Sequence, residues 1–152
     1  MGNILAGEYY DKNVDFVLTM ETKGIPVALM TADALHVPLV IARRASKVYE
    51  GSAVNINYVT AKGDIETMSL SRRAVQSGQR ALIVDDFMRC GGTARGMLTL
   101  MEEFSIEVVG MCFVLAQENP PKRYVTGEKT LMLLCGVEDG GSADVRPAEW
   151  VV

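Results

Sequence analysis

The residues with the clearest chemical potential lie in one stretch, ALIVDDFMRCGGT, at residues 81–93. An apolar run leads into two adjacent carboxylates, Asp85 and Asp86, and a Gly-Gly-Thr turn follows at 91–93. Carboxylates accept hydrogen bonds from a vicinal diol, and consecutive glycines let backbone N–H groups close around an anion without interference from Cβ atoms. A helix that begins at this turn would add its partial positive charge, and the threonine hydroxyl would add one more donor. This order predicts a sugar acceptor beside a phosphate cradle.

The pattern of apolar residues indicates which elements hold this stretch in place. Short runs rich in branched and aromatic residues predict buried strands at residues 14–20, 38–44, 80–86, 108–116 and 130–137, the last of which we expect to be the final strand. Apolar residues at helical spacing predict a helix beginning near Pro26 and another over residues 93–104. Strands that alternate with helices favour an α/β fold with a central, mainly parallel sheet flanked by helices. The 80–86 strand would then present its carboxylates at the edge where such sheets bind ligands.

Residues 46–69 are more polar than the segments around them. The runs SAVNINYV and IETMSLS, joined by the turn AKGD, predict a β-hairpin that we expect to be mobile. We expect Tyr49 and Tyr58 to pack across its strands rather than stack on a base, because aromatic residues in hairpins usually pair in this way. Residues 71–77 read as a short helical piece that ends at Gly78.

Basic residues follow the first two predicted strands. A polar turn at residues 21–24 contains Lys23, which is either a solvated turn lysine or a contact for a bound anion. Arg43, Arg44 and Lys47 follow the second strand, where they either form a solvated strand end or offset the negative charge of a ligand. We expect both groups to face the same ligand as the carboxylate pair.

Length, charge and cysteine content restrict the class of protein. A chain of 152 residues with 49% hydrophobic residues can bury one substantial core, so we expect one domain over residues 1–152. The net charge of -4 argues against a bare nucleic-acid-binding surface. Three widely spaced cysteines favour neither a disulfide framework nor a zinc site and suit a reducing, cytoplasmic setting. The sequence has no apolar run of the about 18 residues that a membrane span needs and no export signal, so we expect no membrane association.

The 81–93 stretch resembles the signature by which type I phosphoribosyltransferases bind phosphoribosyl pyrophosphate (PRPP). The resemblance implies that Asp85 and Asp86 hold the ribose hydroxyls and that the loop from Arg89 to Thr93 holds the 5′-phosphate. It also implies that the 21–24 turn meets the pyrophosphate and that the hairpin is the family's mobile hood. The PRPP-binding residues expected on this basis are Thr22, Lys23, Gly24, Arg43, Arg44, Lys47, Asp85, Asp86, Phe87, Met88, Arg89, Cys90, Gly91, Gly92 and Thr93.

Magnesium is the cofactor that the resemblance implies. Mg²⁺ keeps several waters and binds largely through substrate oxygens, so we expect it to arrive with PRPP and not to occupy a cage of protein ligands. Asp85 and Asp86 are the candidates for any direct contact with the ion.

Within this family, several segments resemble the effector domain of the purine operon repressors of Gram-positive bacteria. They are ETKGIPVA, VPLVIARRASKVYEGSAVNINYV, TMSLSRR and VDDFMRCGGTARGM. The likeness implies a homodimer that senses PRPP and contacts operator DNA only through a winged-helix domain, which has no counterpart in this chain. We therefore expect an effector domain of a purine biosynthesis regulator.

Two other functions remain open. The chain could be an active purine phosphoribosyltransferase of the adenine or xanthine type, or a structural dimerisation module with a vestigial site. Some of these enzymes place an acid in the phosphate loop where this chain has Arg89, and a permanent cation cannot act as a general base. This difference favours the effector interpretation, and we assign no catalytic residue.

Overall fold

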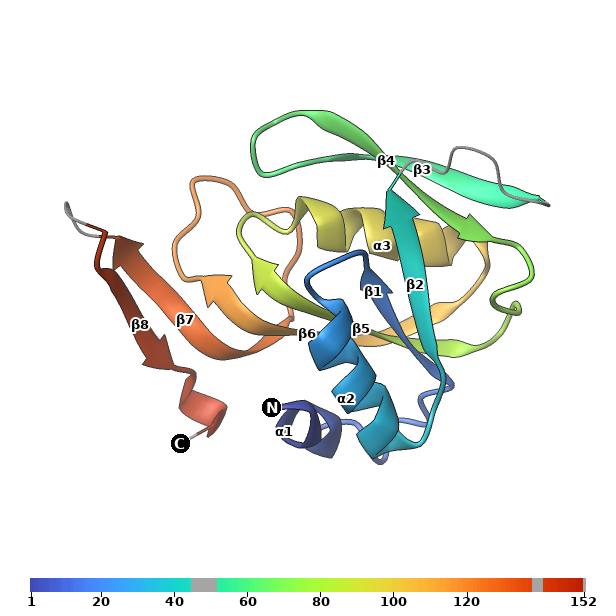
Figure 1. Ribbon diagram of the computed structural model, residues 1–152, viewed down its shortest axis with the longest axis horizontal. Coiled ribbons are helices and arrows are strands. Elements are labelled where there is room, and N and C mark those ends of the chain that lie inside the picture. Colours follow the sequence, from blue (N-terminus) through green and yellow to red (C-terminus); the bar gives the residue numbers. More distant parts are fainter. Residues whose placement is uncertain (45–51, 138–140, 152) are drawn as a thin grey trace.

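The computed structural model describes residues 1–44, 52–137 and 141–151, and these residues form one eight-stranded sheet with helices on both faces (Figure 1). Lys47 and Tyr49 lie outside the described residues. In spatial order, the strands are β3 (Ala53–Val59), β4 (Ile65–Ser71), β2 (Leu39–Arg44), β1 (Phe16–Met20), β5 (Arg80–Met88), β6 (Glu107–Gln117), β7 (Lys129–Val137) and β8 (Ala143–Pro147). The helices are α1 (Gly2–Gly7), α2 (Ile25–Leu35), α3 (Gly92–Glu103) and the 3₁₀ turn η1 (Glu149–Val151).

The centre of the sheet is parallel and its borders are antiparallel. Strand β1 pairs in parallel with β2 and β5, and the parallel pairing continues through β6 to β7. The β3–β4 hairpin joins antiparallel to β2, and β8 joins antiparallel to β7. This arrangement confirms the expected α/β fold with a mainly parallel sheet, and the carboxyl ends of β1, β2 and β5 meet at one edge.

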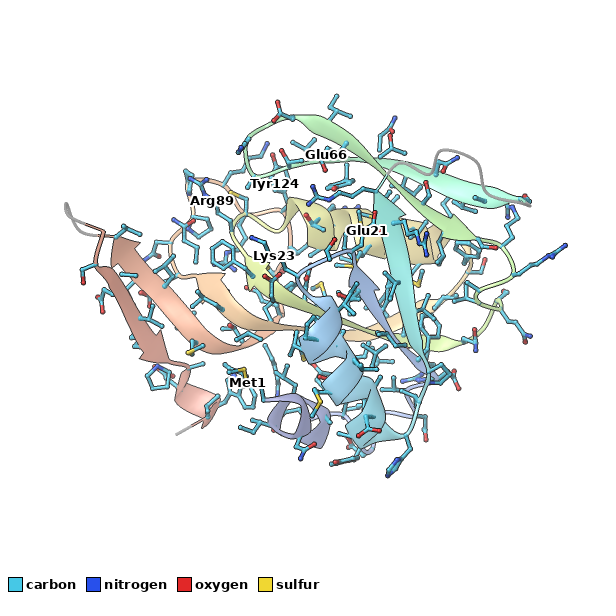
Figure 2. The ribbon with its side chains drawn as sticks, in the orientation of Figure 1. Met1, Glu21, Lys23, Glu66, Arg89 and Tyr124 are labelled. Carbon is cyan, nitrogen blue, oxygen red and sulfur yellow. The ribbon has the colours of Figure 1, made fainter. Side chains whose placement is uncertain are left out.

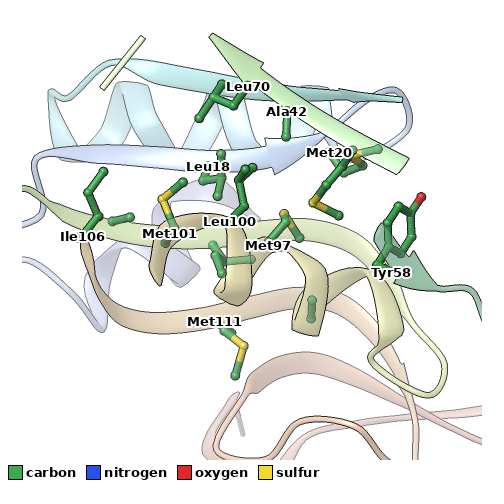
Figure 3. Packing of buried hydrophobic residues seen from close by; sticks show 14 of the residues in the cluster. Leu18, Met20, Ala42, Tyr58, Leu70, Met97, Leu100, Met101, Ile106 and Met111 are labelled. Carbon is green, nitrogen blue, oxygen red and sulfur yellow. The ribbon is translucent and has the colours of Figure 1, made fainter. Parts of the chain in front are cut away.

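Two hydrophobic clusters lie on opposite faces of the sheet because side chains along a strand alternate in direction. From β1, Phe16 and Leu18 join the cluster under α3, while Val17 joins the cluster under α1 and α2. Figure 3 shows the α3 side, where Met97 and Leu100 of the helix meet the strands. The apolar face expected for the 93–104 helix is thus buried, which holds the start of α3 against the sheet.

The β3–β4 hairpin packs directly on α3. A Cβ on Gly96 would lie 2.8 Å from Cβ of Tyr58 and 2.7 Å from Cε of Met68, so only glycine permits this approach. Tyr58 is buried, and its hydroxyl donates a hydrogen bond of 2.7 Å to Glu66 on the paired strand. This contact confirms the expected packing of Tyr58 across the hairpin.

The prediction of a short helix at residues 71–77 is wrong. Ser71 is instead the last residue of β4, and a turn follows in which the Ala74 N–H donates to the Ser71 carbonyl and the Arg72 N–H donates to the Ser52 carbonyl. In a helix of this length, most backbone N–H and C=O groups lie at the two ends and have no partner within the helix. Contacts with other parts of the chain therefore decide the conformation of such a segment.

The C-terminal region also differs from expectation, because 130–137 is not the final strand. Strand β8 adds to the edge of the sheet although all five of its side chains are exposed. An edge strand with no buried face has no apolar alternation to reveal it. Trp150 in η1 then fastens the end of the chain, since its Nε1 donates to the Thr130 carbonyl at 2.8 Å.

The N-terminal helix α1 was not anticipated either. Its sequence, GNILAG, begins and ends with glycine, a poor helix former. Packing compensates, because Leu5 and Ala6 are fully buried and Gly2 fits closely against Met30 of α2.

No helix in the described parts of the chain is both long enough and apolar enough to cross a membrane.

Candidate functional site

A cleft of about 650 Å³ opens at the edge where β1, β2 and β5 end. It is lined by Met20, Glu21, Thr22, Lys23, Arg44, Asp85, Asp86, Phe87 and Thr93. Figure 2 shows the labelled Glu21 and Lys23 near the arrowhead of β1 and the labelled Arg89 just beyond the arrowhead of β5. The fold thus brings together the 21–24 turn, the carboxylate pair and the start of α3.

The two carboxylates lie within β5, which extends to Met88 rather than ending at residue 86. The pairing of β5 with β1 ends at Ile83, while its pairing with β6 continues to Met88. The β1 side of β5 is therefore the side on which the 21–24 turn can approach. Asp86 is half-buried and Phe87 is exposed, so both can meet a ligand in the cleft.

Asp85 is almost fully buried, with 8% of its surface exposed. Burial raises the pKa of its carboxyl to about 7, and the neighbouring charge of Asp86 acts in the same direction. A hydrogen bond of 2.9 Å from the Asp86 N–H to Oδ1 and the charge of Arg44 both lower this pKa. The group thus ionises near neutrality, where a bound cation or hydrogen-bond donor would favour its charged form.

The 21–24 turn lies directly on this carboxyl. A Cβ on Gly24 would be 2.0 Å from Oδ1 of Asp85 and 2.7 Å from Oγ1 of Thr19, so no other residue fits without movement. Glu21 ties the turn to β2, because its Oε1 accepts a hydrogen bond of 2.7 Å from the Arg44 N–H. The Glu21–Thr22 peptide bond is cis. Lys23 is exposed at the tip of the turn and lines the cleft.

The two arginines at the end of β2 point to opposite faces of the sheet, since consecutive strand residues alternate. Arg44 lines the cleft, lies 3.6 Å from a carboxylate oxygen of Glu66, and is on the same side of β2 as Ala42. Arg43 is exposed but is not among the residues that line the cleft. Of this pair, the geometry therefore favours Arg44 as the ligand contact.

The turn before α3 has the features of an anion site. Gly91, with φ of 82°, is the N-cap of α3, and no side chain caps the helix. The first N–H groups of a helix have no partner inside it, so a ligand in the cleft could bind them. Thr93 lines the cleft at this point, while Gly92 is packed against the Val59 carbonyl of the hairpin.

The remaining residues of this turn differ in exposure. Arg89 is exposed, whereas Cys90 is buried and its carbonyl accepts a hydrogen bond from the Tyr124 N–H. Met88 belongs to the hydrophobic cluster under α3. Met88 and Cys90 can therefore contribute to a ligand site only through their backbone.

A second, smaller cavity of about 160 Å³ lies between the hairpin and α3. Arg95, Tyr124 and Gly92 are among the residues that line it. This cavity thus adjoins the main cleft at the start of α3, because Gly92 lines the cavity and the following residue, Thr93, lines the cleft.

Sequence reasoning missed one residue that lines the cleft, Met20, and one that lies behind it against Gly24, Thr19. Met20 is the last residue of β1 and lines the cleft. Thr19 is completely buried, and a polar residue inside the run VDFVLTM was the signal that could have identified it. Among the residues that the structure describes, no three His, Cys, Asp or Glu side chains form a cluster that could hold a metal ion.

Two regulators and one enzyme illustrate the relatives of this chain. It is 42% identical over 135 residues to the purine biosynthesis transcriptional repressor PurR of Bacillus subtilis, which covers 88% of this chain and 47% of the repressor. It is also 42% identical over 133 residues to the transcriptional activator PurR of Lactococcus lactis, covering 87% and 49% of the two chains. The chain thus spans about half the length of these regulators. A xanthine phosphoribosyltransferase of Lactococcus lactis is 35% identical over 117 residues, 76% of this chain and 59% of the enzyme.

Solved structures and a family model agree with this relationship. Adenine phosphoribosyltransferase of Giardia lamblia superposes with a TM-score of 0.76 at 19% identity, covering 85% of this chain and 75% of the enzyme. The enzyme of Rhodothermus marinus gives a TM-score of 0.71 at 25% identity, covering 86% and 77%. The family model described as the phosphoribosyl transferase domain matches residues 2–134. The chain therefore belongs to the phosphoribosyl transferase domain family.

Proposed function

We propose that this chain is the PRPP-binding effector domain of a regulator of purine biosynthesis. The observation that supports this function best is the cleft, in which a glycine-containing turn, two adjacent carboxylates and an uncapped helix start converge. These groups suit the parts of a phosphorylated ribose, and the regulators named above are similar over most of this chain.

Separate groups of residues bind the ribose, the 5′-phosphate and the pyrophosphate of the ligand. Asp85 and Asp86 accept hydrogen bonds from the ribose hydroxyls, and the Arg89–Thr93 turn with the first N–H groups of α3 binds the 5′-phosphate. The pyrophosphate lies beside the backbone of Thr22 and Gly24, with Lys23 and Arg44 supplying positive charge. Arg43 contributes long-range charge to the same end of the sheet, and Lys47, which lies outside the described residues, is retained as a candidate contact from the sequence alone.

Magnesium accompanies the ligand. The paired carboxylates of Asp85 and Asp86 are hard oxygen donors of the type that Mg²⁺ prefers, and the rest of its coordination comes from water and PRPP oxygens. The ion would neutralise part of the pyrophosphate charge, and these two carboxylates would hold it from the protein side.

The hairpin provides the signal. When PRPP binds, contacts with the ligand move the β3–β4 hairpin over the cleft. The added negative charge and the altered shape then lower the affinity of the winged-helix domain for DNA. The regulator acts as a homodimer in the cytoplasm. Ligand and DNA can be coupled in this way only if PRPP has different affinities for the two states.

A direct test is titration calorimetry with PRPP and Mg²⁺. The double variant with Asp85→Asn and Asp86→Asn should lose most of the affinity while its circular dichroism spectrum stays unchanged. Asp33→Asn, an exposed carboxylate on α2, is the matched control and should bind like the wild type. Absence of binding by the wild-type protein would leave only a structural dimerisation module, and equal affinity of the double variant would refute the role of the carboxylates.

The alternative function is a purine phosphoribosyltransferase. It is favoured by the similarity to a xanthine phosphoribosyltransferase, but Arg89, an exposed cation in the phosphate turn, cannot serve as a general base there. Incubation with Mg²⁺, PRPP and each purine separates the two functions. Formation of nucleotide and pyrophosphate above the level of the double variant would establish the enzyme.

A further inference from the structure

Thr19 differs from the other buried polar residues of this protein. Among the residues that the structure describes, its Oγ1 is the buried side-chain oxygen without a hydrogen-bond partner. The hydroxyls of Thr31, Ser69 and Thr130 are buried too, but they donate to Val27, Asn55 and Met132 respectively. A buried polar atom without a partner costs free energy and is rare in folded proteins. The unpaired hydroxyl of Thr19 therefore needs an explanation.

The position of Thr19 supplies one, because its hydroxyl lies beside the carboxyl of Asp85. Both groups touch the site that a Cβ on Gly24 would occupy, at 2.7 Å for Oγ1 of Thr19 and 2.0 Å for Oδ1 of Asp85. The two oxygens are thus no more than about 4.7 Å apart, the sum of these distances. The donor is close to its acceptor but not bonded to it.

A modest movement would complete the bond. A threonine hydroxyl can donate one hydrogen bond, and an ionised carboxylate has about four acceptor positions. Oδ1 of Asp85 already accepts from the Asp86 N–H, which leaves further acceptor capacity on the carboxylate. Rotation of the Asp85 side chain, or a shift of the turn that contains Gly24, would bring the two oxygens to hydrogen-bonding distance.

The proposed ligand would act on both moving parts, since it contacts the Asp85 carboxylate through its ribose and the 21–24 turn through its pyrophosphate. We propose that Thr19 is a positioning residue, whose hydroxyl donates to the Asp85 carboxylate in the ligand-bound protein and fixes its orientation toward the ribose hydroxyls. This inference rests on the function proposed above. It assigns a role in ligand binding to a residue that does not line the cleft.

Two substitutions and one control test the role of Thr19. Thr19→Val keeps a similar shape but removes the hydroxyl, and Thr19→Ser keeps the hydroxyl but removes the methyl group. Thr31→Val is the matched control, because Thr31 is an equally buried threonine on α2 whose hydroxyl is bonded to the backbone of its own helix. Each protein is titrated with PRPP and Mg²⁺ by calorimetry and unfolded in urea without ligand.

We expect Thr19→Val to bind PRPP about tenfold more weakly than the wild type, the effect of one hydrogen bond to a charged group. Its ligand-free unfolding midpoint should equal or exceed that of the wild type, because the lost hydroxyl had no partner. Thr19→Ser should recover most of the affinity, and Thr31→Val should bind PRPP normally even if it unfolds more easily.

Three results would overturn the inference. They are PRPP affinity of Thr19→Val within twofold of the wild type, failure of Thr19→Ser to recover affinity, and a lowered unfolding midpoint of ligand-free Thr19→Val that reveals a partner already present. The first two leave PRPP binding by the wild type intact and so do not affect the proposed function. Absence of PRPP binding by the wild type would remove the proposed function and this inference together.

Discussion

Replacing Asp85 with asparagine should stabilise the ligand-free protein above neutral pH while weakening PRPP binding. The carboxyl is 8% exposed, and burial raises its pKa from 3.8 to about 7. Asparagine has nearly the same shape, can still accept the hydrogen bond from the Asp86 N–H, and carries no charge to bury. The substitution therefore isolates the cost of burying the charge of Asp85.

The sign and size of the effect follow from the pKa. Because the folded-state pKa lies above the unfolded one, the folded protein binds the proton more tightly, and the stability due to Asp85 falls as pH rises from about 4 to about 7. Each pKa unit corresponds to about 1.4 kcal/mol, so a shift of this size sets an upper limit of about 4 kcal/mol. Part of the shift belongs to the pair with Asp86. We therefore expect the difference in free energy of unfolding between Asp85→Asn and the wild type to increase by about 2–3 kcal/mol from pH 4.5 to pH 8, in favour of the variant.

Urea unfolding at several pH values between 4.5 and 8 measures this difference. Other titrating groups cancel when the free energies of unfolding of wild type and variant are subtracted at each pH. Asp33→Asn, which changes an exposed carboxylate, should show no such pH dependence. A difference between Asp85→Asn and wild type that stays constant from pH 4.5 to pH 8 would refute the assignment of a buried, proton-binding carboxyl to this position.

Three further outcomes are expected. Gly24→Ala should weaken PRPP binding and destabilise the protein by about 1–3 kcal/mol, because its Cβ would collide with Asp85. Gly136→Ala is the control, since a Cβ there meets nothing within 4 Å. Equal urea midpoints of the two variants would contradict the close contact at Gly24. Gly96→Ala should lower the free energy of unfolding by about 1 kcal/mol, since crowding against Tyr58 outweighs the better helix propensity of alanine, and increased stability would show that the hairpin does not pack on α3 as described. Removing Mg²⁺ with EDTA should weaken PRPP binding by about tenfold or more in calorimetry, and unchanged affinity would mean that the protein's own cations balance the pyrophosphate charge.

The spacing of apolar residues along the chain was sufficient to predict the central helices and strands. The apolar run of β5 and the helical spacing of Met97, Leu100 and Met101 predicted a strand, a turn and a helix in the order observed. These elements bury one face or both, and the position of each apolar residue therefore follows the period of its own element. The convergence of the carboxylates with the 21–24 turn was predictable as well, because carboxyl ends of neighbouring parallel strands meet at one edge.

Elements without such a pattern could not be predicted. Strand β8 has no buried side chain, and the turn that follows β4 is held partly by a hydrogen bond from the Arg72 N–H to the distant Ser52 carbonyl. Helix α1 contains poor helix formers and is stabilised by packing on α2. In each case contacts between residues far apart in the sequence contribute to the conformation.

The sequence by itself determined the chemical content of the site, namely paired carboxylates, glycines before a helix and nearby cations, because residue type and local period fix what each element can offer. Only the tertiary structure decided which of these groups meet. It placed Arg44, and not Arg43, in the cleft, buried Asp85 beneath Gly24, and brought the unpaired hydroxyl of Thr19 close to that carboxyl. Distances between side chains on different strands depend on register and on the close approach of backbones, and neither is encoded in the spacing of residues along one segment.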